Sequence, residues 1–235
     1  MNVLAFAAHP DDVEEMCFGT LMKYRAQGDQ IFIALSTSGN IGSNLHSSRE
    51  EIASVREKEQ LCAAEPLEAK VKFLRFEDEG LQDTPETRNA FLNAIRWANP
   101  DVILTHSPAD TSTDHAMTSK LITEVLLIVG AKLVPTEEPP IEKTPSVFFW
   151  DIPGGFCFEP QIYVDITDVM DQKIAAIACH QSQMAWMEGF LQDDYLDSMR
   201  AQSRFRGYQY GCKYAEGFTA YQVLGFVADY RLIPR

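Results

Sequence analysis

The sequence lacks an excess of basic residues. Its 235 residues include 20 Lys and Arg against 34 Asp and Glu, which gives a formal charge of −14. Proteins that bind nucleic acids neutralise phosphates with clustered Lys and Arg, so this balance argues against a nucleic-acid partner. It argues equally against polybasic attachment to an anionic membrane surface.

Long apolar runs are also missing. The longest nearly unbroken stretch covers residues 125–134 and contains Gly130 and Lys132. A membrane-spanning helix needs about 20 predominantly apolar residues, so the sequence predicts no membrane span. The N-terminus has no basic segment before its first apolar run, which is not the pattern of a secretion signal. We therefore expect a cytoplasmic protein.

The sequence has neither a Cys-x-x-Cys pair nor a Gly-x-Gly-x-x-Gly segment after its first apolar run. An odd number of scattered cysteines fits neither a set of disulfides nor a zinc ribbon, and we expect reduced thiols in the core. The missing glycine pattern leaves a nicotinamide-dependent dehydrogenase poorly supported. The five cysteines are Cys17, Cys62, Cys157, Cys179 and Cys212.

Short apolar runs alternate with helical patterns, and 46% of the residues are hydrophobic, enough for a sizeable core. Strands are predicted at 2–8, 30–37, 71–76, 101–105, 146–151 and 161–165, with a further strand region near 218–227. Helices are predicted from 13 to about 28 and at 49–64, 84–98, 114–129, 167–187 and 193–211. This alternation predicts an α/β fold, a Rossmann-like, open and mostly parallel sheet with helices on both faces. The proline-rich segment 135–145 is predicted to be a loop within one domain spanning residues 1–235.

Two polar motifs follow predicted strands. His9, Asp11 and Asp12 come directly after the first strand, and His115 opens a helix shortly after the fourth. Strands 1 and 4 are neighbours where the strand order of such a sheet reverses, so both motifs are expected at one edge. Imidazole and carboxylate ligands suit zinc or a similar divalent metal. The plainer alternative is that both motifs are polar turns whose aspartates cap helices.

In the metal-site interpretation, His9, Asp12 and His115 form a set of two histidines and one carboxylate. Such a set leaves a position open for water, which is typical of catalytic rather than structural zinc sites. Asp11, next to a ligand but itself free, is then placed to act as a base toward that water.

The sequence Ala-His-Pro-Asp-Asp at 8–12, with Asp-His-Ala at 114–116, resembles the PIG-L/LmbE-like family of zinc-dependent N-deacetylases. Segments 56–59, 77–81, 173–183 and 214–218 also look like family signatures. By position, the resemblance implies His9, Asp12 and His115 as metal ligands, Asp11 as general base, and Arg56 and Asp78 as contacts for sugar hydroxyls. It also implies an N-acetylglucosamine-type substrate and a homo-oligomer, a trimer or hexamer.

The second motif departs from the family pattern. Family members usually carry His-Pro-Asp-His there, whereas this chain has Ser112, Thr113, Asp114 and His115. We place Ser112 and Asp114 among the substrate-binding residues, but a serine cannot carry the proton that the family histidine carries. Three alternatives stay open: His106 replaces that histidine as a catalytic residue, Asp11 serves both proton roles, or the reaction differs. His106 is equally well interpreted as a hydrogen-bonded histidine at a strand end.

The predicted function is hydrolysis of an N-acylated amino sugar or a related small amide by a metal-dependent enzyme. Zn²⁺ is the expected cofactor, although Fe²⁺ accepts the same ligands. Two alternatives remain: a hydratase or lyase that acts on an unsaturated acid at the same zinc site, and a weakly catalytic metal-binding protein.

Overall fold

The central element is a seven-stranded sheet with the order β3-β2-β1-β4-β5-β7-β6. The computed structural model describes residues 1–191 and 194–234. Neighbouring strands from β3 to β5 run parallel, and β7 is antiparallel to both β5 and β6, which confirms the mostly parallel sheet. The strands are β1 (Asn2–Ala7), β2 (Gln30–Thr37), β3 (Lys70–Phe76), β4 (Val102–Thr105), β5 (Ser146–Trp150), β6 (Ile162–Asp165) and β7 (Ala215–Ala220), with β8 (Gln222–Val223) and β9 (Phe226–Val227) forming a separate pair.

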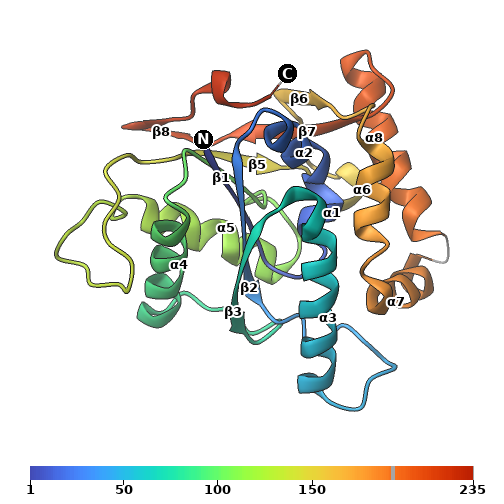
Figure 1. The fold of residues 1–235 in the computed structure, drawn as a ribbon, viewed down its shortest axis with the longest axis horizontal. Helices are drawn as coiled ribbons and strands as arrows, with labels where there is room; N and C mark the ends of the chain where they lie inside the picture. Colours follow the sequence, from blue (N-terminus) through green and yellow to red (C-terminus); the bar gives the residue numbers. More distant parts are fainter. Residues whose placement is uncertain (192–193, 235) are drawn as a thin grey trace.

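Helices cover both faces of the sheet, as predicted. Figure 1 shows α4 and α5 on one side, and α1, α3, α6 and α8 on the other. The α-helices are α1 (Asp12–Met16), α2 (Phe18–Ala26), α3 (Arg49–Ala64), α4 (Pro85–Ala98), α5 (Thr113–Leu126), α6 (Met170–Ile177), α7 (Gln181–Leu191) and α8 (Tyr195–Tyr210). Short 3-10 turns lie at Glu65–Leu67, Pro153–Gly155 and Tyr230–Leu232.

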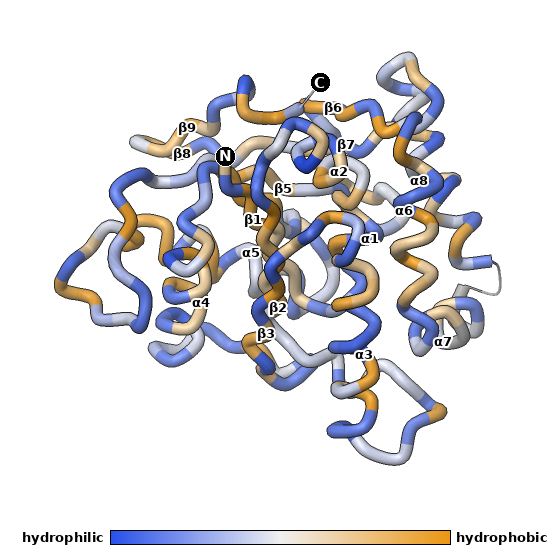
Figure 2. Tube along the Cα trace, viewed as in Figure 1, coloured by the Kyte–Doolittle hydropathy of each residue, from blue (hydrophilic) through white to orange (hydrophobic). Residues whose placement is uncertain are grey.

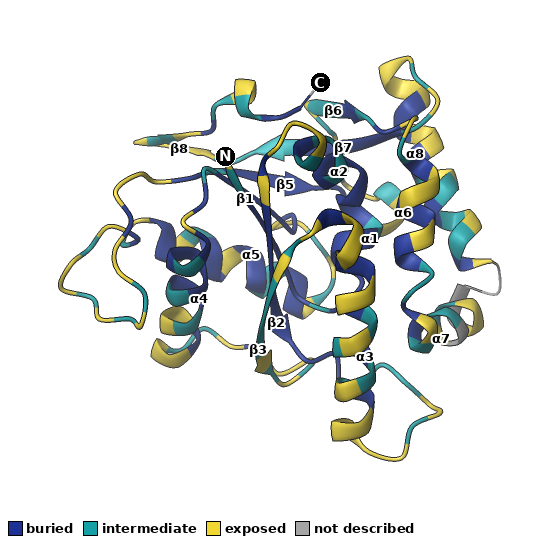
Figure 3. Cartoon of the chain, in the orientation of Figure 1, coloured by how far each residue is buried: buried dark blue, intermediate teal, exposed yellow. Residues whose placement is uncertain are grey.

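The alternation of side chains along β1 divides the core into two layers. Val3 and Ala5 pack with α2 and α6 on one face, whereas Leu4 and Phe6 pack with α4 and α5 on the other. The central strands are therefore apolar along their length in Figure 2 and buried in Figure 3. A strand covered on both faces has a continuous run of hydrophobic residues, and such runs are the pattern from which the sequence predicted these strands.

The predicted helix from 13 to about 28 is interrupted at Cys17, and α1 and α2 are separate helices. The carboxylate of Glu216, on β7, accepts hydrogen bonds from the backbone N–H groups of Gly19 and Thr20 at 2.9 and 2.7 Å. This carboxylate satisfies the first amides of α2, so a new helix begins there. The contact joins residues almost 200 positions apart, and a local sequence pattern does not reveal it.

The predicted helix 167–187 is likewise wrong as a single element, because α6 ends at Ile177 and α7 begins at Gln181. Between them His180 is fully buried, and its Nε2 lies 3.2 Å from Glu14 Oε2. The last helix was predicted to begin at 193, which lies outside the described residues, and α8 is seen from Tyr195.

The cysteine prediction holds only for Cys17, which is buried in the core. Cys62 and Cys157 are exposed, and Cys179 and Cys212 are half-buried, although all five are free thiols. Cys62 and Cys157 lie at exposed positions of α3 and of the turn after β5. Among the described segments, none of the helices combines the length and apolar character needed to cross a bilayer.

Candidate metal and active site

The two polar motifs meet at the carboxyl ends of β1 and β4. These strands pair in parallel register with Phe6 opposite Thr105, so the chain leaves both strands at the same edge of the sheet. His9 and Asp12 follow β1, and His115 lies in the first turn of α5. The edge of the sheet where the strand order reverses is thus occupied by imidazoles and carboxylates, as the sequence predicted.

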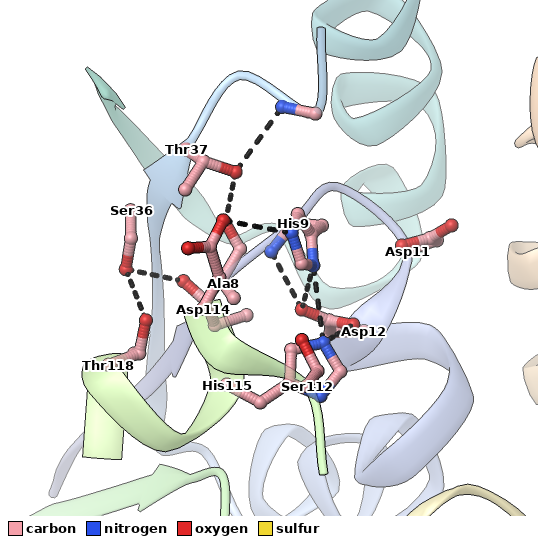
Figure 4. Close-up of polar contacts among 12 residues, drawn as sticks. Ala8, His9, Asp11, Asp12, Ser36, Thr37, Ser112, Asp114, His115 and Thr118 are labelled. Atoms are coloured by element: carbon pink, nitrogen blue, oxygen red, sulfur yellow. Dashed lines mark hydrogen bonds and ion pairs between the residues drawn. The ribbon is translucent and has the colours of Figure 1, made fainter. Parts of the chain in front are cut away.

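His9, Asp12 and His115 point toward one another (Figure 4). Nδ1 of His9 lies 3.2 Å from Nε2 of His115, which lies 3.3 Å from Asp12 Oδ1. Nδ1 of His9 is 3.5 Å from Asp12 Oδ2. In a tetrahedral zinc site with bonds of about 2.0–2.1 Å, ligand atoms lie roughly 3.3 Å apart. The three side chains therefore fit a zinc ion both in donor chemistry and in spacing.

A carboxylate holds the outer nitrogen of each imidazole. Nδ1 of His115 lies 3.0 Å from Asp110 Oδ2, and Nε2 of His9 lies 3.1 Å from Asp78 Oδ1. Carboxylates in this position fix the ring orientation of metal-binding histidines and make the inner nitrogen a better ligand. Sequence reasoning did not identify Asp110 as the partner of His115; its position five residues before His115, ahead of the helix, was the available signal.

The surplus of carboxylates around the two imidazoles shapes the electrostatics. Burial lowers the pKa of His115, but the charge of Asp12 and the hydrogen bond with Asp110 outweigh it and raise the pKa to about 10. Burial also lowers the pKa of His9, and contacts with Asp114, Asp12 and Asp78 raise it well above its usual range. The site attracts positive charge, which a divalent cation would supply.

Asp11 lies beside the cluster, with its carboxylate turned away from the proposed ligands (Figure 4). It is mostly buried, and its Oδ2 lies 3.1 Å from Arg56 Nη2. Burial raises the pKa of Asp11, the charge of Arg56 opposes that effect, and the charge of Asp12 adds to it, so the pKa is raised overall. A carboxylate with a raised pKa suits a group that must accept and hold a proton.

Arg56 and Asp78 both line the cleft above the cluster. Arg56 is only 4% exposed, and it donates from Nη1 to Gly39 O at 3.0 Å and from Nη2 to Pro10 O at 2.6 Å. Asp78 contacts His9 through Oδ1 and accepts a hydrogen bond from the Ile41 N–H through Oδ2. Both side chains therefore already have protein partners at the base of the cleft.

Ser112 and Asp114 are absent from the described lining of that cleft. Ser112 precedes α5, where its N–H donates to Asp110 Oδ1 at 3.0 Å. Asp114 is fully buried and accepts hydrogen bonds from the N–H groups of Glu79 and Leu81 at 2.8 and 3.4 Å. These bonds fasten the loop that carries Asp78. A substrate contact by Ser112 or Asp114 stays a prediction.

His106 lies behind Asp12. It is 1% exposed, its Nε2 accepts a hydrogen bond from the Ala8 N–H at 2.9 Å, and its ring stacks on His115 at 4.0 Å. Burial and the charge of His115 lower its pKa to about 4, although Asp12 opposes them. The ring is therefore neutral near pH 7. These contacts fit the strand-end interpretation of His106, and its catalytic role stays a prediction.

The cleft has a volume of about 440 Å³. The proposed ligands and Asp11 lie at its base, the loop of Ile41 and Gly42 forms one wall, and α7 contributes Gln183 and Trp186. A pocket that combines apolar and aromatic walls with a few convergent polar groups is typical of a small-molecule site.

The fold and site define a class: α/β proteins with two histidines and one carboxylate that could hold a metal ion at the reversal of strand order. The family described as PIG-L, GlcNAc-PI de-N-acetylase, matches residues 4–126, more than half of the chain. The chain belongs to this family, which confirms the resemblance inferred from the motifs.

Relatives extend the match over most of the chain. Diacetylchitobiose deacetylase of Thermococcus kodakarensis is 29% identical over 227 residues, covering 92% of this chain and 81% of the relative. The solved structure of N,N'-diacetylchitobiose deacetylase from Pyrococcus horikoshii, complexed with its inhibitor MPG, has a TM-score of 0.81 at 26% identity and covers 93% of this chain and 83% of that one. 4-oxalmesaconate hydratase of Pseudomonas putida is 26% identical over 190 residues, 77% of this chain and 74% of the relative.

Proposed function

We propose that this protein is a metal-dependent N-deacetylase that removes the acetyl group from an N-acetylated amino sugar or a related small amide. The observation that carries the proposal is the cluster of His9, Asp12 and His115, with Asp11 beside it at the base of one cleft. The family and the two deacetylase relatives support the same reaction.

Zinc is the proposed cofactor, held by His9, Asp12 and His115. The donor set, two imidazoles and one carboxylate, is the kind that catalytic zinc sites use, and ferrous iron accepts the same ligands. The chemistry supplied by a bound divalent cation is polarisation of the amide carbonyl and a lower pKa for a water molecule.

Asp11 performs the proton transfers in this proposal. Its carboxylate accepts a proton from the attacking water as the new C–O bond forms at the amide carbon. It then returns that proton to the nitrogen as the C–N bond breaks, which yields a free amine and acetate. The pKa of Asp11, raised by burial, favours the first half of this transfer, because it makes the carboxylate a stronger base. One group serves both steps, so neither Ser112 nor the neutral His106 is required to carry a proton.

The cleft favours a neutral or cationic substrate. Asp78 and Glu79 line it together with Asp11, and these carboxylates would repel a polyanion. Asp78 and Arg56 remain the proposed contacts for sugar hydroxyls. Trp186, which is 38% exposed and also lines the cleft, offers an aromatic face for the apolar side of a sugar ring.

A second candidate is hydration of an unsaturated acid. The relative named 4-oxalmesaconate hydratase shows that a protein similar over 77% of this chain catalyses a hydration. Ser112, at the position of the family histidine, is the sequence feature that keeps this alternative open.

The two functions are separated by a direct assay. Zinc-loaded protein is incubated with N-acetylglucosamine, diacetylchitobiose and glucosamine conjugates, and free amine and acetate are quantified. A parallel arm follows the ultraviolet absorbance of conjugated unsaturated acids. We expect amine and acetate in equal amounts from at least one sugar. Loss of absorbance in the second arm without any amine in the first would replace the deacetylase proposal by the hydratase.

Cytoplasmic location and a homo-oligomer, a trimer or hexamer, belong to the same proposal. The location rests on the five scattered, free cysteines, and the oligomer rests on the family resemblance. Sedimentation velocity of the purified protein, with a monomer of 26.5 kDa as reference, tests the oligomer. A single monomeric species at micromolar concentration would contradict it.

A further inference from the structure

Two side chains of α3 hold the peptide group that joins Pro10 to Asp11. Arg56 Nη2 donates to the carbonyl oxygen of Pro10 at 2.6 Å, and the N–H of Asp11 donates to Gln60 Oε1 at 3.3 Å. Arg56 and Gln60 are four residues apart and therefore lie on the same face of the helix. Both polar groups of one peptide are thus fixed by one helix, and both side chains are buried.

The backbone of Asp11 needs such support. Its φ of 117° and ψ of −29° lie where side chains other than glycine are rarely found. A strained conformation of this kind persists only where surrounding contacts over-determine it. The conformation turns the Asp11 side chain away from Asp12, so that one carboxylate joins the metal cluster and its neighbour faces the cleft (Figure 4).

The orientation of the Gln60 amide is itself fixed. Its Nε2 donates to Oε1 of Glu14 at 2.8 Å, and the other oxygen of Glu14 lies 3.2 Å from His180 Nε2. Gln60, Glu14 and His180 are all fully buried. A carboxylate only accepts hydrogen bonds, so Glu14 obliges Gln60 to turn its N–H₂ toward it and its oxygen toward Asp11.

We propose that Gln60, with its amide orientation set by Glu14, is a positioning residue that holds Asp11 in the geometry required for proton transfer. This inference rests on the proposed function of Asp11. Arg56 acts on the same peptide from the other side, in addition to pairing with the Asp11 carboxylate. Gln60 contacts Asp11 only through its backbone N–H, so its effect on the reaction is indirect.

Exchanging the carboxylate and the amide between positions 14 and 60 distinguishes a positioning role of Gln60 from a general contribution to stability. Gln60→Met keeps the size of the side chain and removes the acceptor. Gln60→Glu keeps the acceptor for the Asp11 N–H but places a second carboxylate against that of Glu14. The double variant Glu14→Gln/Gln60→Glu restores every bond: the new amide at 14 donates to the carboxylate at 60 and accepts from His180, and the carboxylate at 60 accepts from the Asp11 N–H.

The experiment measures kcat, KM, zinc content and thermal midpoint of the unaltered protein and these variants, and solves the crystal structures of Gln60→Met and the double variant. We expect Gln60→Met to lower kcat at least about tenfold, because small misplacements of a catalytic group are costly. Zinc content and KM should stay near those of the unaltered protein, φ of Asp11 should leave its positive value, and the double variant should recover most of the lost kcat. Tyr24→Phe, which removes one partly buried hydrogen bond to Leu232 O, is the matched control and should lower the thermal midpoint without lowering kcat.

Two results would overturn the positioning role: a Gln60→Met enzyme with kcat within about twofold of the unaltered protein, or a double variant no more active than Gln60→Glu alone. The second comparison decides the question even when Gln60→Met does not fold. Absence of activity in the unaltered protein would instead count against the proposed deacetylase function. The Asp11 backbone angle in the variant crystals would then still test the contact.

Discussion

Oδ2 of Asp110 lies 3.0 Å from Nδ1 of His115, while Nε2 of the same ring lies 3.3 Å from Asp12 Oδ1. The Asp110 carboxylate therefore orients the imidazole, and the Asp12 carboxylate lies beside the nitrogen proposed to bind the metal. Asp110→Ala should weaken zinc binding by about 10- to 100-fold, since removing a carboxylate that hydrogen-bonds a metal-binding histidine has an effect of this size. Competition with a chromophoric chelator measures the affinity. Asp168→Ala, at an exposed ion pair with Lys23, is the control, and equal affinities for both variants would contradict the role of Asp110.

Removing the three proposed ligands should abolish the metal site. His9→Ala, Asp12→Ala and His115→Ala are each expected to lose stoichiometric zinc, because two remaining donors bind weakly. Binding to the unaltered protein should weaken as the pH falls, since the ligands bind zinc in their deprotonated forms. Elemental analysis after gel filtration gives the stoichiometry. Full zinc occupancy in the His115→Ala protein would show that the metal lies elsewhere.

Asp11→Asn should separate metal binding from catalysis. The amide keeps the shape of the side chain but cannot accept the proton, so kcat is expected to fall by about 10²- to 10⁴-fold. Zinc content should be unchanged, because the Asp11 carboxylate is turned away from the proposed ligands (Figure 4). Steady-state amine release and zinc analysis on the same sample test both statements. A fully active Asp11→Asn enzyme would refute the assignment of Asp11 as base.

Glu15 makes stability depend on pH. Burial and the charges of Asp11 and Asp12 raise its pKa to about 8, so the folded chain keeps a proton that the unfolded chain releases above about 4.5. The contribution of Glu15 to the free energy of unfolding therefore decreases as the pH rises from about 4.5 to 8. Glu15→Gln removes this pH-dependent decrease. The variant should therefore exceed the unaltered protein in free energy of unfolding by a larger margin at pH 8 than at pH 5. Urea unfolding at both pH values measures the difference, and a gain independent of pH would rule out the titration of Glu15.

The buried pair of Lys173 and Glu216 should be important for stability. Their side chains lie 2.6 Å apart, each 2% exposed, and Glu216 also accepts the first amides of α2. Glu216→Gln leaves the Lys173 ammonium without its counter-charge, so a loss of about 3–5 kcal/mol in unfolding free energy is expected. Asp168→Asn, at the exposed end of an ion pair, should cost at most about 1 kcal/mol. Denaturant unfolding of both variants provides the comparison.

The elements that the sequence predicted well are those whose pattern is local. β1, β2 and β4 are covered on both faces, and their continuous apolar runs marked them. The helices that were predicted too long, 13 to about 28 and 167–187, are divided where buried residues from distant segments interact: Glu216 with the start of α2, and Glu14 with His180. Such contacts leave no periodic signal in either segment.

For the candidate site, too, the sequence predicted the local features but not the contacts between distant side chains. The types of its donors and their positions directly after β1 and β4 are properties of the sequence, and the parallel pairing of those strands brings them together. The ring nitrogens that face each other and the part played by Asp110 depend on side-chain orientation, which short motifs do not specify.

The sequence by itself determined the chemistry of this protein: the imidazoles and carboxylates, and the family to which the chain belongs. The tertiary structure decided how those groups are held. Asp11 has its positive φ because α3 presents Arg56 and Gln60, each more than 40 residues away, to the same peptide group. The physical reason is that a strained backbone and a buried charge are stable only where partners from other segments meet them, and packing alone brings those partners together.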